Sequence, residues 1–131
     1  MKFRLPLNTR HFFKFSLLIL ILPLLISACD SSAERKEIAL AAWQMIDDGA
    51  LVIDVRSPKE YAGGHLEIAA NIPHTDTAAL IKAIGENKSR PVVLYCRSGQ
   101  RSGVAQQALA KAGYYNIFNG LGFKRLQAIR R

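Results

Sequence analysis

Hydrophobic and polar positions along the chain follow two periods, and these predict strands and helices in alternation. Mostly apolar runs are typical of buried strands; they lie at 51–55, 91–95 and 114–118, with a brief extended piece at 70–73. Apolar residues at helical spacing, or a serine N-cap followed by proline, predict helices at 34–48, 57–61, 75–84, 104–112 and 123–129. The sequence Asn-Gly-Leu-Gly at 119–122 predicts a turn between the last strand and the last helix.

This alternation predicts an α/β fold with an open, mainly parallel sheet. In such sheets, ligands bind outside the carboxyl ends of the strands. Asp54–Arg56 end one buried run, and Cys96–Arg101 follow another. We therefore expect these two polar segments to meet at one edge of the sheet.

The first 28 residues have the pattern of an export signal. Four basic residues without any acid precede a mostly apolar stretch at 15–26. That stretch is shorter than the roughly 20 residues needed to cross a bilayer, and Pro23 interrupts it. It favours a removable signal peptide at 1–28 over a transmembrane helix.

The cleavage region Ile26-Ser27-Ala28-Cys29 resembles the bacterial lipobox. This resemblance implies that Cys29 is acylated and becomes the first residue of an exported protein, anchored by lipid to a membrane facing the periplasm. Asp30 is similar to the aspartate that retains some lipoproteins at the inner membrane. Residues 29–33 then form the lipidated end and a short tether, and 34–131 form the domain. An ordinary cleavage site and an uncleaved anchor remain alternatives.

Charge and length fit one small domain. The whole chain has 18 Lys and Arg against 10 Asp and Glu, a net charge of +8. Removing the four basic residues of the signal leaves 14 against 10, and this modest excess gives no indication of nucleic-acid binding. The 103 residues that remain of the 131 after removal of the first 28 suffice for one compact domain.

Cys96 is the strongest candidate for chemistry. It lies where a buried strand ends and a helix begins, so unpaired backbone N–H groups and the positive end of the helix dipole face it. Arg97 and Arg101 belong to the same loop, and such surroundings lower a thiol pKa. If Cys29 carries lipid, Cys96 has no partner for an internal disulfide. We therefore interpret Cys96 as a nucleophile.

Four segments in order resemble the signatures of single-domain rhodaneses, which are sulfurtransferases. They are Ile53–Arg56 with Glu60-Tyr61, Gly64–Leu66 with Ala69–Pro73, Leu94–Ser102, and Ala112–Gly120. The resemblance implies a rhodanese-like parallel sheet with helices on both faces. This chain departs from the family's pattern at Ile68-Ala69, which affects the local turn geometry. It also departs at Gly120–Phe123, so acceptor specificity does not carry over.

The resemblance also implies a reaction. The thiolate of Cys96 would take the outer sulfur of thiosulfate as a persulfide and pass it to a thiol or to cyanide. Backbone N–H groups would cradle that sulfur, and two arginines would orient the donor; these substrate-binding residues are Arg97, Ser98, Gly99, Gln100, Arg101 and Ser102. No cofactor or metal is implied, and we expect a monomer.

The other polar residues have supporting roles in this interpretation. Asp54 and Arg56 match the paired charges behind the family's loop, and we interpret them as scaffold. We expect His65 to be structural and His74 to be an exposed residue at a helix start. Their spacing relative to Cys96 does not predict a metal site.

Two other classes of function remain open. A cysteine phosphatase or arsenate reductase also cradles an oxyanion, but its loop has five residues between Cys and Arg. Here Arg101 follows after four, so the loop suits a sulfur atom better than a tetrahedral phosphate. A rhodanese-like module that only carries sulfur, senses redox state or binds a partner is the second alternative.

Overall fold

The structure is a computed structural model that describes residues 22–130, with side chains from residue 31 onward. Helix α2 (Leu22–Asp47) includes all but the last residue of the helix predicted at 34–48, and it begins earlier. Residues from Arg35 onward form one compact unit. Most of the predicted signal peptide lies outside the described residues, and the boundary before Cys29 stays a prediction.

None of the helices described between residues 22 and 130 has the length and hydropathy needed to span a membrane.

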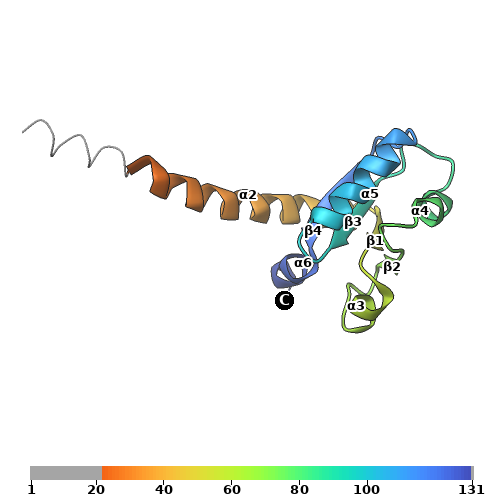
Figure 1. Cartoon of the computed structure of the whole chain (residues 1–131), viewed down its shortest axis with the longest axis horizontal. Helices are drawn as coiled ribbons and strands as arrows, with labels where there is room; N and C mark the ends of the chain where they lie inside the picture. Colours follow the sequence, from red (N-terminus) through yellow and green to blue (C-terminus); the bar gives the residue numbers. More distant parts are fainter. Residues whose placement is uncertain (1–21, 131) are drawn as a thin grey trace, which may run out of the picture. The chain divides into compact units, whose positions relative to one another are not determined.

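The compact unit is built on a parallel sheet (Figure 1). Its strands, in the spatial order β2-β1-β3-β4, are β2 (Ala70–Asn71), β1 (Leu51–Asp54), β3 (Val92–Cys96) and β4 (Ile117–Gly122). Every described pairing is parallel, and Asp54 lies beside Tyr95 at the carboxyl ends of β1 and β3. The predicted α/β fold with a parallel sheet is therefore confirmed.

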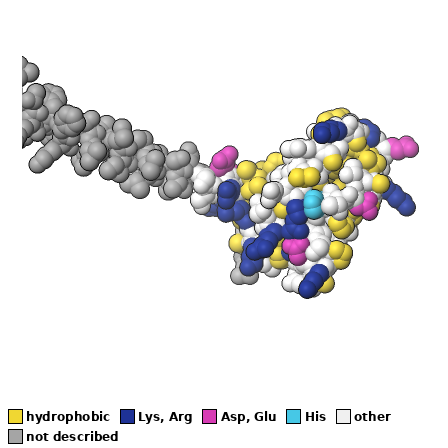
Figure 2. Space-filling model, viewed as in Figure 1, with side chains coloured by type: hydrophobic (Ala, Val, Ile, Leu, Met, Phe, Trp, Pro, Cys, Tyr) yellow, Lys and Arg dark blue, Asp and Glu magenta, His cyan; other side chains and the backbone are white. Residues whose placement is uncertain are grey.

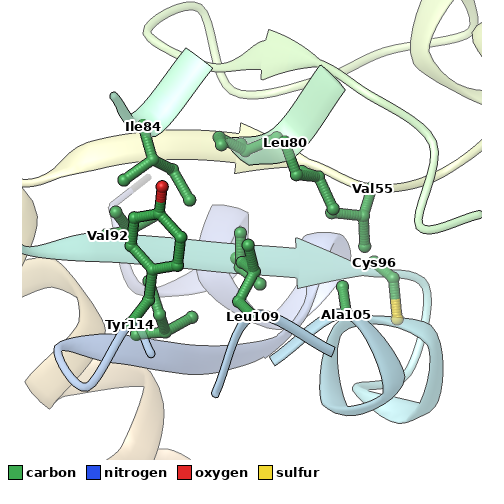
Figure 3. Close-up of a cluster of buried hydrophobic side chains, with 11 residues drawn as sticks. Val55, Leu80, Ile84, Val92, Cys96, Ala105, Leu109 and Tyr114 are labelled. Carbon is green, nitrogen blue, oxygen red and sulfur yellow. The ribbon is translucent and has the colours of Figure 1, made fainter. Parts of the chain in front are cut away.

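Neighbouring residues of β1 and β3 point to opposite sides of the sheet, so both faces carry apolar side chains. Helices cover both of these faces. Ile53, Leu94 and Cys96 belong to one apolar cluster, which helices α4 (Thr77–Ile84) and α5 (Gln100–Lys111) cover. Figure 3 shows this cluster, with Cys96 at the end of β3 and Ala105 of α5 beside it. The other cluster contains Val52, Val93 and Tyr95, and helices α2 and α6 (Phe123–Ile129) cover it.

The last strand differs from its prediction at 114–118. Residues 114–116 connect α5 to the sheet, and Tyr114 is buried with its hydroxyl donating to the Gly85 carbonyl oxygen. β4 instead begins at 117 and runs to 122, through the turn expected at 119–122. The glycines of that segment serve close packing, since a Cβ on Gly120 would lie 3.1 Å from Val93 Cγ1. The predicted turn was wrong because these glycines fit inside a strand that packs tightly.

Candidate active site

The thiol of Cys96 lies at the bottom of the loop that joins β3 to α5. The side chain is fully buried, and the loop closes over it. The Gly99 backbone N–H donates to Sγ at 3.1 Å, and Ser102 Oγ lies 3.5 Å from Sγ. Burial raises the pKa of Cys96, but hydrogen bonds from the Ser102 hydroxyl and from backbone N–H groups of Ser98, Gly99 and Ser102 lower it to about 7. The thiol therefore ionises near neutral pH.

Gly99 gives the loop its shape. Its φ of 103° lies in the left-handed region, which glycine adopts without strain, and α5 starts at the next residue. A Cβ at this position would also lie 3.0 Å from Leu121 Cδ2 of β4. Glycine thus allows the chain to reverse tightly and to aim its N–H at the sulfur.

Asn119 of β4 fixes the loop from the neighbouring strand, and sequence reasoning missed this residue. Its Nδ2 donates to the Gly99 carbonyl oxygen at 2.8 Å, and its Oδ1 lies 2.7 Å from Ser102 Oγ. The Leu121 backbone N–H donates to the same Oδ1 at 3.0 Å. The available signal was a single amide side chain within an otherwise apolar strand, but this segment was predicted to be a turn.

The two arginines of the loop differ in their partners. Arg101 forms a two-pronged ion pair with Glu60, with N–O distances of 2.7 and 2.8 Å. Glu60 was not among the predicted site residues, although its capping box with Ser57 at the start of α3 (Pro58–Ala62) was a local signal. Arg97 is exposed and lines two cavities beside the loop. Of the two arginines, Arg97 is therefore the more available to an anion.

The remaining predicted loop residues divide by exposure. The side chains of Ser98 and Gln100 are exposed, whereas Gly99 and Ser102 are buried. The buried pair faces the thiol, and the exposed pair lines the outer surface of the loop.

Asp54 and Arg56 form a closed unit at the end of β1. Asp54 accepts from the Arg56 backbone N–H at 2.9 Å and from its guanidinium at 2.6 to 3.0 Å. Arg56 also donates to the Gly64 carbonyl oxygen at 2.6 Å and lies over the Phe123 ring, 4.7 Å from its centroid. The hydrogen bond with Asp54 raises the Arg56 pKa, against the opposing effect of burial. This arrangement fits a scaffold role, since both charges are satisfied within the fold.

The histidines lie apart from the thiol chemistry. His65 Nδ1 is 2.9 Å from the Tyr61 carbonyl oxygen, and its ring stacks on the Tyr61 ring at 3.6 Å. His74 is half-buried and precedes α4, which begins at Thr77, so its predicted exposure was too high. Between residues 22 and 130, no three His, Cys, Asp or Glu residues gather as metal ligands would.

Known proteins share this sequence pattern. The sequence model of the Rhodanese-like domain family matches residues 39–123, which include the cysteine loop. The Bacillus subtilis protein named Uncharacterized protein YqhL is 44% identical over 77 residues, or 58% of this chain and 60% of that protein. Thiosulfate sulfurtransferase PspE of Escherichia coli is 36% identical over 72 residues, or 55% of this chain and 69% of that protein. The chain thus spans about 60% of the length of the Bacillus relative.

A solved structure also matches this fold. The structure described as a rhodanese with anions from E. coli has a TM-score of 0.55 and 34% sequence identity. The match covers 59% of this chain and 91% of that one. Nearly the whole of that domain therefore corresponds to the described sheet and its helices.

Proposed function

This chain belongs to the rhodanese-like domain family, and on that premise we propose that it is a thiosulfate sulfurtransferase that carries sulfur on Cys96. The observation that carries the proposal is the buried thiol that accepts from the Gly99 N–H and ionises near pH 7. A thiolate is the reactive form of cysteine, and N–H groups aimed at sulfur stabilise negative charge there.

In the first half of the proposed reaction, the Cys96 thiolate attacks the outer sulfur of thiosulfate. A bond forms between Sγ and that sulfur, the sulfur–sulfur bond of thiosulfate breaks, and sulfite leaves with the electron pair. The product is a persulfide whose terminal sulfur carries the negative charge. The exposed guanidinium of Arg97 is the group that would orient the incoming dianion.

In the second half, a thiolate or cyanide attacks the terminal sulfur of the persulfide. The bond between that sulfur and Sγ breaks, and its electron pair returns to Cys96 as a thiolate. The enzyme is then ready for another cycle, and no metal or redox cofactor takes part in either step.

Mass spectrometry of the purified full chain tests this proposal. Incubation with thiosulfate should add about 32 Da, the mass of one sulfur atom, and cyanide should remove it. Cys96→Ser should show no addition, whereas Cys29→Ser should retain it. Absence of the adduct from the native chain would refute the persulfide mechanism.

We also propose that the protein is exported and acylated on Cys29, with the domain facing the periplasm as a monomer. The basic and apolar pattern of residues 1–28 and the lipobox-like Ile26–Cys29 support this location. Labelling cells with a radioactive fatty acid tests it, because the native chain should take up label and Cys29→Ser should not. Equal labelling of both chains would exclude this lipid site.

A further inference from the structure

A basic cavity lies next to the cysteine loop. Its volume is about 430 Å³, and cationic side chains from three segments line it: Arg35, Arg97, Lys124 and Arg125. Ser98, Leu121, Gly122 and Ala128 complete the lining, so no acid is part of it. Figure 2 shows several Lys and Arg side chains lying close together on the face in view.

The charge of this cavity is not neutralised by the fold. Within the part of the chain whose side chains are described, the ion pairs are Asp54–Arg56, Glu60–Arg101 and Asp47–Arg130. None of the four cations of the cavity belongs to these pairs. Several positive groups around one hollow attract an anion that bears more than one negative group.

The cavity is adjacent to the loop that carries the reacting cysteine. Arg97 and Ser98 directly follow Cys96, and Gly122 is the residue of β4 that pairs with Cys96 in the sheet. A Cβ on Gly122 would lie 2.6 Å from the Arg97 carbonyl oxygen, so glycine allows the close approach of the loop to this wall. A molecule that fills the cavity therefore touches the loop that carries Cys96.

The size of the cavity exceeds what the donor requires. Small-molecule sites commonly measure about 300–1,000 Å³, and this cavity falls in that range. Thiosulfate has only five atoms, and one guanidinium already suits it. Four cations around one cavity of this volume fit a molecule larger than thiosulfate that bears more than one negative group.

We propose that this cavity binds the carboxylates of an anionic thiol, which is the sulfur acceptor. The proposal rests on the sulfurtransferase function and specifies its second substrate. Lys124 and Arg125 hold the carboxylates, and Arg97 belongs to the loop that carries the persulfide. The acceptor thiolate then bonds to the terminal sulfur, the bond to Sγ breaks, and the electron pair stays on Cys96.

Glutathione and its dimethyl ester test this inference, because they share a thiol and differ in two carboxylates. The chain is first loaded with sulfur from thiosulfate, and its transfer to each thiol is followed at low salt and corrected for the thiolate fraction. The double variant Lys124→Gln/Arg125→Gln removes two charges of the cavity. The matched control Lys82→Gln/Lys111→Gln removes two exposed charges elsewhere, on α4 and α5.

We expect the native chain to transfer sulfur faster to glutathione than to the ester. In the Lys124/Arg125 variant this ratio of rates should fall about three- to tenfold, which is the size of effect expected for solvent-exposed charge pairs. The control should keep the preference, and about 1 M salt should reduce it by screening.

Equal rates for the two thiols in the native chain would overturn the proposal. So would a variant that slows persulfide formation from thiosulfate as much as transfer to glutathione, because the cavity would then serve the donor. Failure of the native chain to form any persulfide would instead refute the sulfurtransferase function itself.

Discussion

The carboxyl ends of β1 and β3 lie side by side, and each is followed by an arginine, but the two regions use their charges in different ways. At the end of β1, Asp54 and Arg56 are buried and satisfy each other. At the end of β3, the loop directs N–H and hydroxyl groups toward Cys96, while Arg97 stays exposed. In the first region the charges pair with each other, and the second presents the unpaired charge of Arg97.

One edge of the sheet thus carries a rigid region and a reactive region side by side. A buried pair whose opposite charges meet each other holds the backbone in place. A thiol surrounded by donors can ionise and accept a new bond without reorganising its surroundings. Substitutions in the two regions should therefore affect different measurements.

Cys96→Ser gives the largest expected effect and defines the reactive region. Removal of the nucleophile should lower thiosulfate sulfurtransferase activity by at least about a thousandfold. Serine fits the same space beside Ala105, so the urea midpoint should change little. Assays of cyanide-dependent product formation and urea unfolding on one preparation measure both. Retention of a tenth of the activity would contradict the assigned role.

Asp54→Ala should produce the opposite pattern at the neighbouring strand end. It leaves the Arg56 guanidinium buried without its carboxylate, and loss of one partner of a buried pair destabilises by about 3 kcal/mol or more. Urea unfolding at constant slope measures this change. Asp54→Ala/Arg56→Met removes both charges and should recover part of the lost stability. A single variant as stable as the native chain would mean that the pair is not structural.

Much of this contrast was predictable from the sequence. The order of strands and helices followed from apolar periods, and Cys96 was placed correctly at the end of a buried strand. These features are local, because a strand and the loop after it are adjacent in the chain. The scaffold interpretation of Asp54 and Arg56 stays a prediction, which their mutual hydrogen bonds support.

The contacts across the fold were not predictable in the same way. Glu60 and Arg101 are 41 residues apart, and Gly99 and Asn119 are 20 apart, so no local pattern joins either pair. The glycines near Asn119 also resemble those of a turn, so the strand that carries this residue was predicted at the wrong place in the chain. Side chains that brace the loop thus depend on tertiary packing, which a single sequence does not specify residue by residue.

Ser102→Ala should have a smaller effect, on the pH dependence of the reactive region. The Ser102 hydroxyl has one proton, and a thiolate at Cys96 favours a hydrogen bond in which this proton is donated to sulfur. Without this donor, the Cys96 pKa should rise from about 7, by about half to one unit. Persulfide formation at pH 6 should then slow about three- to tenfold, with recovery at higher pH. Stopped-flow rates between pH 5.5 and 9 measure the midpoint.

Ser98→Ala is the matched control for Ser102→Ala. Its side chain is exposed in the same loop, and the structure gives its hydroxyl no hydrogen bond to Sγ. The pH midpoint of Ser98→Ala should equal that of the native chain. An equal midpoint for Ser102→Ala would show that the backbone N–H groups alone stabilise the thiolate.

Glu60→Gln should have the smallest effect. It tests whether the ion pair that is more exposed to water contributes less to stability than the buried one. The Glu60 and Arg101 side chains are 33% and 29% exposed, whereas Asp54 and Arg56 are 0% and 8% exposed. A pair open to water contributes about 0.2–1 kcal/mol. Glutamine also keeps the capping interaction with Ser57, so the loss of unfolding free energy should stay below about 1 kcal/mol.

The pH dependence of this loss separates the ion pair from other roles of Glu60. The hydrogen bond from Arg101 holds the Glu60 pKa well below its usual range. A depressed pKa in the folded state stabilises the fold fully above the unfolded carboxyl pKa of about 4.5, and this contribution falls as pH drops below it. The difference in urea midpoint between the native chain and Glu60→Gln should therefore be larger at pH 6 than at pH 3. Glu86→Gln, at an exposed position, should show no such trend. An equal difference at both pH values for Glu60→Gln would mean that the charge of Glu60 contributes nothing to stability. Of the two ion pairs, only the buried one would then stabilise this edge of the sheet.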